Sequence, residues 1–170
     1  MKMAVLKSKV YGDRNLLYDD QDEDFVLVHV WTLKKHTKRN LYYCQTRILV
    51  NEKYTQRLFH RLLLGVSNPK IFVDHINHNG LDNRRENLRF CTSTQNQGNA
   101  RKGGRGSSLY KGVHFSSEIK RANKPWRARI KVNGKYKYLG SYTSEKDAAI
   151  VYNKAALEYF GEFACLNEFE

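Results

Sequence analysis

Residues with the chemistry of a phosphodiester-cutting site gather between positions 74 and 96. Asp74 and His75 stand side by side, and Asn96 follows in a chain whose formal net charge is +13. A neutral histidine can act as a general base on water. Carboxylate and amide oxygens suit a hard cation such as Mg²⁺, which keeps several waters and needs few protein ligands. These residues predict a nuclease site in which His75 activates water and Asp74 and Asn96 hold the metal ion.

Two short strands and a tight turn are predicted around Asp74 and His75. Residues 71–73 are apolar, residues 79–80 are the turn-forming pair Asn-Gly, and residues 88–90 can return as the second strand. Neighbouring residues in a regular strand point to opposite faces of the sheet. Asp74 and His75 can therefore serve one site only if their strand bends or ends there.

A short helix is predicted after the second strand. Thr92 and Gln95 have the spacing of a capping box, so the helix is expected to begin there and to carry Asn96 in its second turn. The N-terminus of such a helix has a partial positive charge that can face a phosphate. The whole segment thus predicts a β-β-α unit.

This segment resembles the HNH endonuclease family, in particular phage homing endonucleases with Asp-His at the first motif position. The resemblance covers roughly residues 54–99, including Phe59-His60-Arg61-Leu62, Val73-Asp74-His75-Ile76-Asn77 and Asn83 through Arg89. It implies that His75 is the general base and that Asn87 braces the loop and orients the histidine. It also implies that Asp74 and Asn96 are the metal ligands. Because Asn96 stands where many relatives have histidine, one Mg²⁺ or Mn²⁺ per active site is expected, without structural zinc.

Other polar residues of the segment have less specific roles. Arg84, Arg85 and Arg89 are candidates for DNA contact, although each can also be a solvated side chain. Four residues are expected to be structural rather than catalytic, namely a helix histidine, a turn histidine and two turn-forming asparagines: His60, His78, Asn77 and Asn83.

Positive charge is concentrated in residues 101–140, which hold 12 lysines and arginines against one acidic residue. These basic residues alternate with aromatic ones in strand-like segments. Such a pattern favours a nucleic-acid-binding surface over a merely solvated one.

A β-hairpin is predicted around Asn133-Gly134, with Val132 opposite Lys135. This pairing places a basic and aromatic set on one face, made of Arg127, Arg129, Lys131, Tyr136, Tyr138 and Gly140. The other face is mostly apolar, with Trp126, Ala128, Ile130, Val132 and Leu139. A strand over residues 110–115 can complete a three-stranded sheet.

A helix is predicted from Thr143 or Ser144 to Gly161, and its stripe of Ala148, Tyr152, Ala155 and Tyr159 can cover the apolar face. The basic face then remains free for the major groove of B-DNA, which is about 12 Å wide.

Residues 109–167 resemble the plant ethylene-response-factor (Apetala-type) DNA-binding domain. The motifs that carry the resemblance include Tyr110-Lys111-Gly112-Val113, Trp126-Arg127-Ala128-Arg129-Ile130 and Tyr138-Leu139-Gly140-Ser141-Tyr142. The resemblance implies that the sheet reads the major groove through Lys111, His114, Lys131, Tyr136 and Tyr138, and the hairpin pairing adds Arg127 and Arg129. Tyr138 stands where tryptophan is usual, and His114 and Tyr136 stand where arginines are usual. The plant recognition sequence is therefore not expected.

The predicted fold class is α+β, with a β-β-α-metal HNH module and a three-stranded antiparallel sheet packed on one helix. Four regions are expected: an N-terminal β-rich region (1–53), the HNH module (54–99), a basic Gly/Ser linker (100–108) and the DNA-binding domain (109–170). In the first region, residues 25–31 and 41–50 predict strands. Residues 54–65 predict a helix, because Leu58, Leu62 and Leu63 recur at helical spacing.

The sequence thus predicts a sequence-specific, metal-dependent DNA endonuclease of the homing type that acts on double-stranded DNA as a monomer and mainly nicks one strand. The alternatives are a non-catalytic DNA-binding transcriptional regulator and an RNA-binding accessory protein, which fits the charge but not the paired motifs. The three cysteines are far apart in sequence, as in a reducing compartment. No apolar run approaches the roughly 20 residues of a membrane span, and the N-terminus is too short and polar for a signal peptide. A cytoplasmic location is expected, in the host cell if the gene is phage-encoded.

Overall fold

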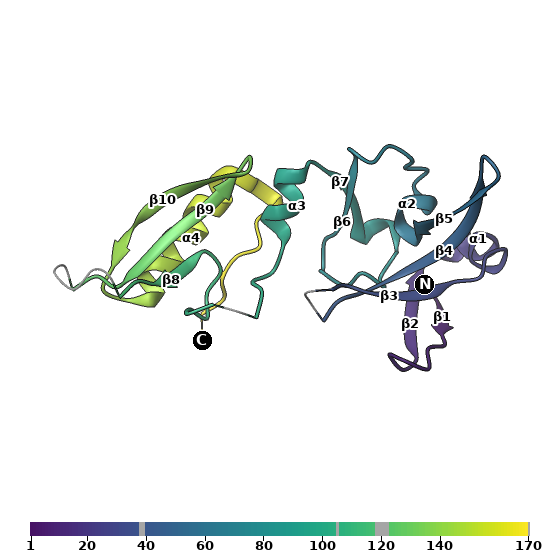
Figure 1. Cartoon of the computed structure of the whole chain (residues 1–170), viewed down its shortest axis with the longest axis horizontal. Coiled ribbons are helices and arrows are strands. Elements are labelled where there is room, and N and C mark those ends of the chain that lie inside the picture. The colour runs from purple at the N-terminus through teal and green to yellow at the C-terminus, as the bar shows by residue number, and fades with distance from the viewer. Residues whose placement is uncertain (38–39, 105, 118–122, 170) are drawn as a thin grey trace. The chain divides into compact units, whose positions relative to one another are not determined.

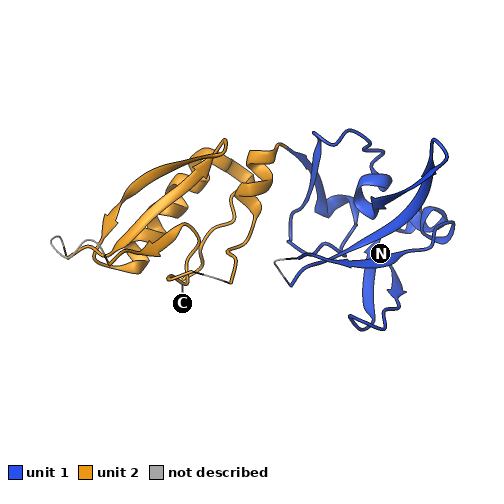
Figure 2. Cartoon of the chain, viewed as in Figure 1, with its two compact units in different colours: residues 1–91 blue, residues 92–170 orange. Residues whose placement is uncertain are grey.

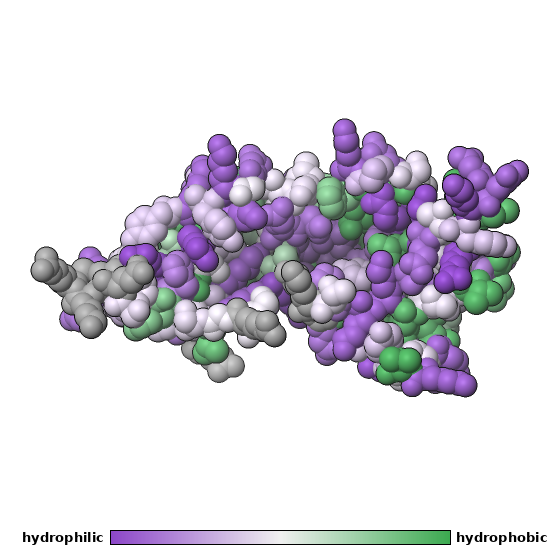
Figure 3. Space-filling model, viewed as in Figure 1, coloured by the Kyte–Doolittle hydropathy of each residue, from purple (hydrophilic) through white to green (hydrophobic). Residues whose placement is uncertain are grey.

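A computed structural model of the chain describes residues 1–37, 40–104, 106–117 and 123–169. The chain divides into two compact units, residues 1–91 and residues 92–170 (Figure 2), and each is described by itself. Among the described residues, no helix is long and apolar enough to cross a membrane. On the face drawn in Figure 3, hydrophilic residues dominate each unit, in keeping with a chain of which 28% is charged.

Unit 1 consists of small antiparallel sheets joined by short helices (Figure 1). Strands β1 and β2 form one sheet, β3, β4 and β5 a second, and β6 and β7 a third. The elements in chain order are β1 (Lys2–Leu6), β2 (Arg14–Tyr18), the 3₁₀ turn η1 (Asp20–Asp22), α1 (Glu23–Leu27), β3 (Thr32–Lys35), β4 (Tyr42–Val50), β5 (Lys53–Leu58), α2 (Phe59–Leu63), β6 (Phe72–His75), the 3₁₀ turn η2 (Arg85–Asn87) and β7 (Leu88–Cys91).

The core of unit 1 lies around Phe59, the first residue of α2, which is fully buried. Its ring packs against Trp31 at 4.6 Å and Phe25 at 5.4 Å between ring centroids. Buried side chains from the N-terminal strands and from β4, such as Leu16 and Cys44, belong to the same cluster. The core therefore holds α2 against the β3–β4–β5 sheet, which we call the central sheet, and ties it to the N-terminal residues.

The predicted strand over residues 25–31 is wrong. Residues 23–27 form α1, and β3 begins only at Thr32. Phe25 packs on Phe59 and Val26 is buried in the same core, while the indole of Trp31 donates a hydrogen bond to the Val26 carbonyl at 2.9 Å. Burial of these side chains outweighs the local β-propensity of the valines.

The predicted helix over residues 54–65 is also wrong in its first half. Residues 53–58 form β5, which pairs with β4 through a tight turn at Asn51 and Glu52. Both turn residues have positive φ angles, 48° and 63°. Two central residues with positive φ make the turn that matches the twist of a hairpin. Within this segment only Phe59–Leu63 is helical, because the residues before it pair with β4 as a strand.

Unit 2 is a three-stranded antiparallel sheet in the order β10-β9-β8, packed on helix α4. Ala148 and Ala149 of α4 pack against Val113 and Ala128 of the sheet. The elements are α3 (Ser93–Asn99), β8 (Val113–Phe115), β9 (Trp126–Val132), β10 (Lys135–Tyr142), α4 (Glu145–Phe160) and the 3₁₀ turn η3 (Gly161–Phe163). The sheet and helix predicted for this region are confirmed.

The boundaries of α4 follow their sequence signals. The Ser144 hydroxyl accepts hydrogen bonds from the backbone N–H groups of Lys146 and Asp147, and Gly161 is the C-cap. The Asn133-Gly134 turn also forms as predicted, with both φ angles positive. Local capping and turn chemistry thus determines these ends.

The hairpin register is as predicted from Val132 opposite Lys135 to Arg129 opposite Tyr138, and then shifts at a bulge. Gly140 lies opposite Ala128 rather than Arg127, so the predicted place of Gly140 is wrong. Ser141 takes the position opposite Arg127. Gly140 has a φ of +127°, and a Cβ atom there would lie 2.6 Å from the Tyr142 hydroxyl. This backbone conformation suits glycine and permits the bulge.

Helix α3 has the predicted capping box at Thr92 and Gln95, and it packs within unit 2. Gly98 lies so close to Phe160 that a Cβ atom would be 2.6 Å from the ring. The Gly98 carbonyl accepts hydrogen bonds from the Cys165 N–H at 3.1 Å and the Lys111 ammonium at 2.5 Å. The helix that carries Asn96 is therefore anchored to the end of α4.

Candidate functional site

Asp74 and His75 are the last two residues of β6, and both are buried. Asp74 lies opposite Arg89 of β7, and His75 lies opposite Leu88. The strand ends at His75, and both residues still pair in regular register with β7. A carboxylate and an imidazole are thus held next to each other at the edge of a short hairpin.

The His75 ring lies in a polar and aromatic surrounding. Its Nε2 donates to the Asn83 side-chain oxygen at 3.2 Å, and the His60 ring stands perpendicular to it with centroids 4.8 Å apart. Tyr43 of β4 has its ring 5.9 Å from both histidines. Because Nε2 carries the proton in this contact, the lone pair of the neutral ring is on Nδ1.

Burial lowers the pKa of His75, although the hydrogen bond to Asn83 and the carboxylates of Asp74 and Asp82 act in the opposite direction. Burial, together with His75 and Arg61, lowers the pKa of His60 to about 3. Both imidazoles are therefore neutral near pH 7. A neutral histidine is the form that can accept a proton from water.

Asn87 braces the loop that follows β6. Its side-chain oxygen accepts from the Asn77 N–H at 3.0 Å, and its amide donates to the Asp82 carbonyl at 2.7 Å and the Asn77 side chain at 3.0 Å. The side chain that bonds to His75 is instead Asn83, which is fully buried. Sequence reasoning treated Asn83 as a turn former, since nothing in its spacing indicates that its amide points at the histidine.

The same loop is closed by an ion pair and a close backbone approach. Arg84 donates to both oxygens of Asp82, at 2.8 and 2.7 Å, and this lowers the pKa of that carboxyl. Gly80 lies against β4, where a Cβ atom would be 2.5 Å from the Tyr42 carbonyl oxygen. The loop is therefore held in one conformation beside His75.

The three arginines predicted to contact DNA all bind carboxylates within unit 1. Arg84 pairs with Asp82 and Glu86, Arg85 pairs with Asp22 at 2.7 Å, and Arg89 pairs with Asp74 at 3.2 Å. The Arg85 N–H also donates to Asp19 at 2.8 Å. Each of these guanidinium groups would have to share or exchange its carboxylate to hold a phosphate.

The predicted metal ligands are oxygen donors, and they belong to different units. Asp74 lies in unit 1 and Asn96 lies on α3 of unit 2. In the described part of the chain, no group of three or more His, Cys, Asp and Glu side chains is placed to hold a metal ion. A carboxylate and an amide fit a hard cation that keeps much of its water, such as Mg²⁺ or Mn²⁺.

The sheet of unit 2 presents the predicted basic and aromatic face. Tyr136 and Tyr138 are 62% and 65% exposed, and the Arg129 guanidinium lies 4.5 Å above the Tyr136 ring centroid. Lys131 lies opposite Tyr136, and Arg127 lies opposite His114 of β8. Cations stacked on exposed tyrosines form a surface suited to nucleic acid.

Two of the residues carried over for DNA contact, Lys111 and His114, are partly buried within unit 2. The Lys111 ammonium donates to the Gly98 carbonyl and lies 5.9 Å from the Tyr152 ring centroid. His114 is half-buried, and burial together with Arg129 and Arg127 lowers its pKa. The described residues offer no hydrogen-bond partner to its Nδ1.

Comparison with known proteins identifies the segment around Asp74 and His75. Residues 53–97 match the HNH endonuclease family. The segment is therefore similar to an HNH endonuclease domain. The predicted resemblance is thereby confirmed for this segment, which holds β5, α2, the β6–β7 hairpin and part of α3.

The chain is similar to a viral protein named as an HNH endonuclease and to two plant transcription factors. An HNH endonuclease of Acanthamoeba polyphaga mimivirus, itself uncharacterized, is 36% identical over 115 residues, which are 67% of this chain and 57% of that protein. An AP2-like ethylene-responsive transcription factor of Arabidopsis thaliana is 46% identical over 65 residues, and another ethylene-responsive factor of that plant is 45% identical over 65 residues. These matches cover 37% of this chain and 18% and 14% of the plant proteins. They support the C-terminal resemblance loosely.

Proposed function

We propose that the chain is a sequence-specific, divalent-metal-dependent DNA endonuclease of the homing type, in which the HNH domain cuts and the sheet of unit 2 reads the DNA. The observation that carries the proposal is the pair at the end of β6: a buried, neutral His75 next to the carboxylate of Asp74. The viral relative, which is named as an HNH endonuclease, aligns with 67% of this chain.

In the proposed reaction, His75 accepts a proton from water at Nδ1, because Nε2–H is held by Asn83. Asn87 keeps the loop beside the histidine in place through its bonds to Asn77 and Asp82. Asp74 and, as the sequence predicts, Asn96 would hold one Mg²⁺ or Mn²⁺, and such an ion would supply charge neutralisation at the phosphate and at the leaving 3′ oxygen. Arg89, which is paired with Asp74 in this structure, would bind the phosphate when DNA is present.

Cutting of a supercoiled plasmid tests the proposal. We expect cutting with Mg²⁺ or Mn²⁺ and none in excess chelator. His75→Ala should lower the rate by about 10²–10⁴, the usual cost of losing a general base, while DNA binding persists. His78→Asn is the matched control, because this nearby histidine lies in a turn with a φ of 64°, which asparagine tolerates.

Two outcomes would reject the proposal. Full activity of His75→Ala would show that the base is another group. Cutting in excess chelator would show that the reaction needs no metal ion. Sequence-selective binding of DNA without any cutting would favour a transcriptional regulator instead.

A further inference from the structure

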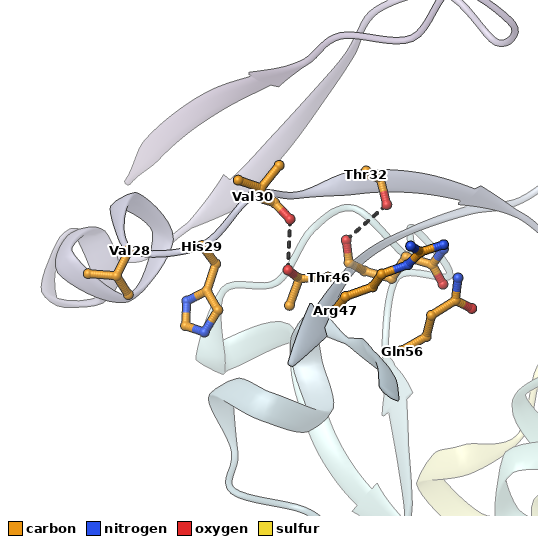
Figure 4. Close-up of a pocket in the computed structure, with 8 residues that line it drawn as sticks. Val28, His29, Val30, Thr32, Thr46, Arg47 and Gln56 are labelled. Atoms are coloured by element: carbon orange, nitrogen blue, oxygen red, sulfur yellow. Dashed lines mark hydrogen bonds between the residues drawn. The ribbon is translucent and has the colours of Figure 1, made fainter. Parts of the chain in front are cut away.

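A cavity of about 430 Å³ lies on the central sheet of unit 1 (Figure 4). Its walls are residues 28–30 after α1, Thr32 of β3, residues 45–47 of β4 and Gln56 of β5. Thr46 donates its hydroxyl to the Val30 carbonyl at 2.7 Å, and Thr32 donates to the Gln45 carbonyl at 3.2 Å. These bonds fix the walls, so the cavity does not depend on a ligand to form.

The cavity has a positive side chain and no carboxylate in its lining. Arg47 is exposed, and within the described ranges it makes no ion pair or side-chain hydrogen bond. The arginines of the HNH segment differ, because Arg84, Arg85 and Arg89 are each paired with a carboxylate. A guanidinium presents a fork of N–H donors that matches a phosphate.

A buried acceptor lies in the same lining. The side-chain oxygen of Gln45 is buried and has no hydrogen-bond partner among the described residues. A buried polar atom of this kind costs free energy unless a water or a ligand satisfies it. Arg47 and Gln45 together fit a ligand that offers an anion and an N–H donor, such as the phosphate and base of a nucleotide, once the Gln45 amide turns from its buried position into the cavity.

The strand that carries these groups also reaches the nuclease site. Tyr43, Gln45 and Arg47 are alternate residues of β4, so they lie on one face of the sheet. The Tyr43 ring lies 5.9 Å from that of His75. The five residues from Tyr43 to Arg47 span about 13 Å, so a DNA strand held beside His75 can continue to Arg47.

We infer that this cavity binds one nucleotide of the DNA substrate, on the strand that enters the nuclease site. The phosphate lies on Arg47 and the base edge meets Gln45. The inference rests on the proposed function for its choice of DNA as the ligand. It adds a second contact in the same unit, away from the reacting atoms, which holds the strand that enters the site.

The test is DNA affinity in the full chain carrying His75→Ala, measured by fluorescence anisotropy over a range of salt. Arg47→Gln should weaken binding about tenfold and reduce the slope of log affinity against log salt by about one. Arg47→Lys should restore the slope, because it keeps the charge. Gln45→Leu should weaken binding without changing the slope. Arg57→Gln is the control, because this neighbouring arginine of β5 does not line the cavity.

Two measurements place the contact. With His75 present, Arg47→Gln should raise KM about tenfold and leave kcat within about twofold, since the contact is distant from the chemistry. Interference by single ethylated phosphates should show one position, away from the nick, at which ethylation weakens binding of the parent and has no effect on binding of Arg47→Gln.

Equal affinity and salt slope in Arg47→Gln, Arg57→Gln and the parent would overturn the inference. Arg47-dependent binding of a free deoxynucleotide, with no effect of Arg47 on DNA affinity, would also overturn it and make the cavity an effector site. If the chain fails to cut DNA while Arg47 still controls DNA affinity, the proposed nuclease activity fails and the inference stands.

Discussion

His60 and His75 are two buried imidazoles in edge-to-face contact, and their burial sets how this protein responds to acid. Protonation of either ring would place a charge in the interior and beside the other ring. The interior therefore favours the neutral form of both side chains. The same condition that prepares His75 for base chemistry makes the folded state sensitive to low pH.

Unit 1 should lose stability as the pH falls below about 6.5. The pKa of His60 is about 3 in the folded chain and close to 6.5 when unfolded, so the unfolded chain binds more protons between these values. The stability is fully present above pH 6.5 and falls by about 1.4 kcal/mol for each pH unit below it, or about 2 kcal/mol at pH 5. The lowered pKa of His75 acts in the same direction.

Urea unfolding at pH 7.5 and pH 5 measures this loss. His60→Gln removes the titrating group, and it should flatten the pH dependence even if the variant is less stable at pH 7.5. A pH dependence as steep in His60→Gln as in the parent would assign the acid sensitivity to other groups.

The residues of the candidate site were predictable where a motif holds them together in sequence. Asp74, His75 and Asn87 belong to one short segment, and the capping box indicates where the helix with Asn96 begins. The pairing of Arg85 with Asp22 was not predictable, because the partners are 63 positions apart and only the folded chain brings them together. Arginines that appear ready for phosphate in the sequence are neutralised by carboxylates in the fold.

At the scale of elements, prediction succeeded where local chemistry decides the structure. The Asn133-Gly134 turn and the caps of α4 are read from two or three adjacent residues. Helix α1 and strand β5 were missed, because α1 forms to bury Phe25 and Val26 and β5 forms by pairing with β4. These causes lie in distant residues, which a local pattern does not report.

Gly112 and Gly134 offer a matched test of packing in the sheet of unit 2. Their φ angles are nearly equal, +76° and +80°, so alanine is strained equally at both. A Cβ atom at Gly134 meets nothing within 4 Å, whereas one at Gly112 would lie 1.9 Å from the Tyr152 ring. We expect Gly134→Ala to cost about 1 kcal/mol and Gly112→Ala about 2–3 kcal/mol more.

Thermal and urea unfolding of both variants gives the two values. The difference between them reports the collision with the Tyr152 ring and with the Arg129 carbonyl oxygen, 2.8 Å away, because the backbone strain is common to both. Equal losses in the two variants would mean that α4 can move away from β8 at little cost.

At the scale of the whole molecule, the chain joins one HNH domain to one sheet of basic and aromatic residues. In the proposed reaction, one base and one metal ion would direct one water molecule at one strand per encounter. Two proposed DNA-contacting regions in a single chain would also remove the need for a second copy to cover an asymmetric site. We therefore expect a monomer that nicks.

A time course on a supercoiled target should show open-circle DNA first, with linear DNA minor and late. The initial rate should rise in proportion to enzyme concentration. Linear product without an open-circle intermediate, with a rate that rises as the square of enzyme concentration, would instead indicate a dimer that cuts both strands together.

The ion pairs of η2 with the N-terminal residues also limit how this protein could have exchanged parts with others. The HNH match begins at residue 53, yet Arg85 within it is held by Asp19 and Asp22, and Leu17 bonds through its backbone to Leu81 and Asn83. A gene fusion that carried only the matched segment would leave a cation without its carboxylates and a loop without its backbone partners. The smallest piece that keeps these contacts is therefore larger than the matched segment and includes β2 and η1.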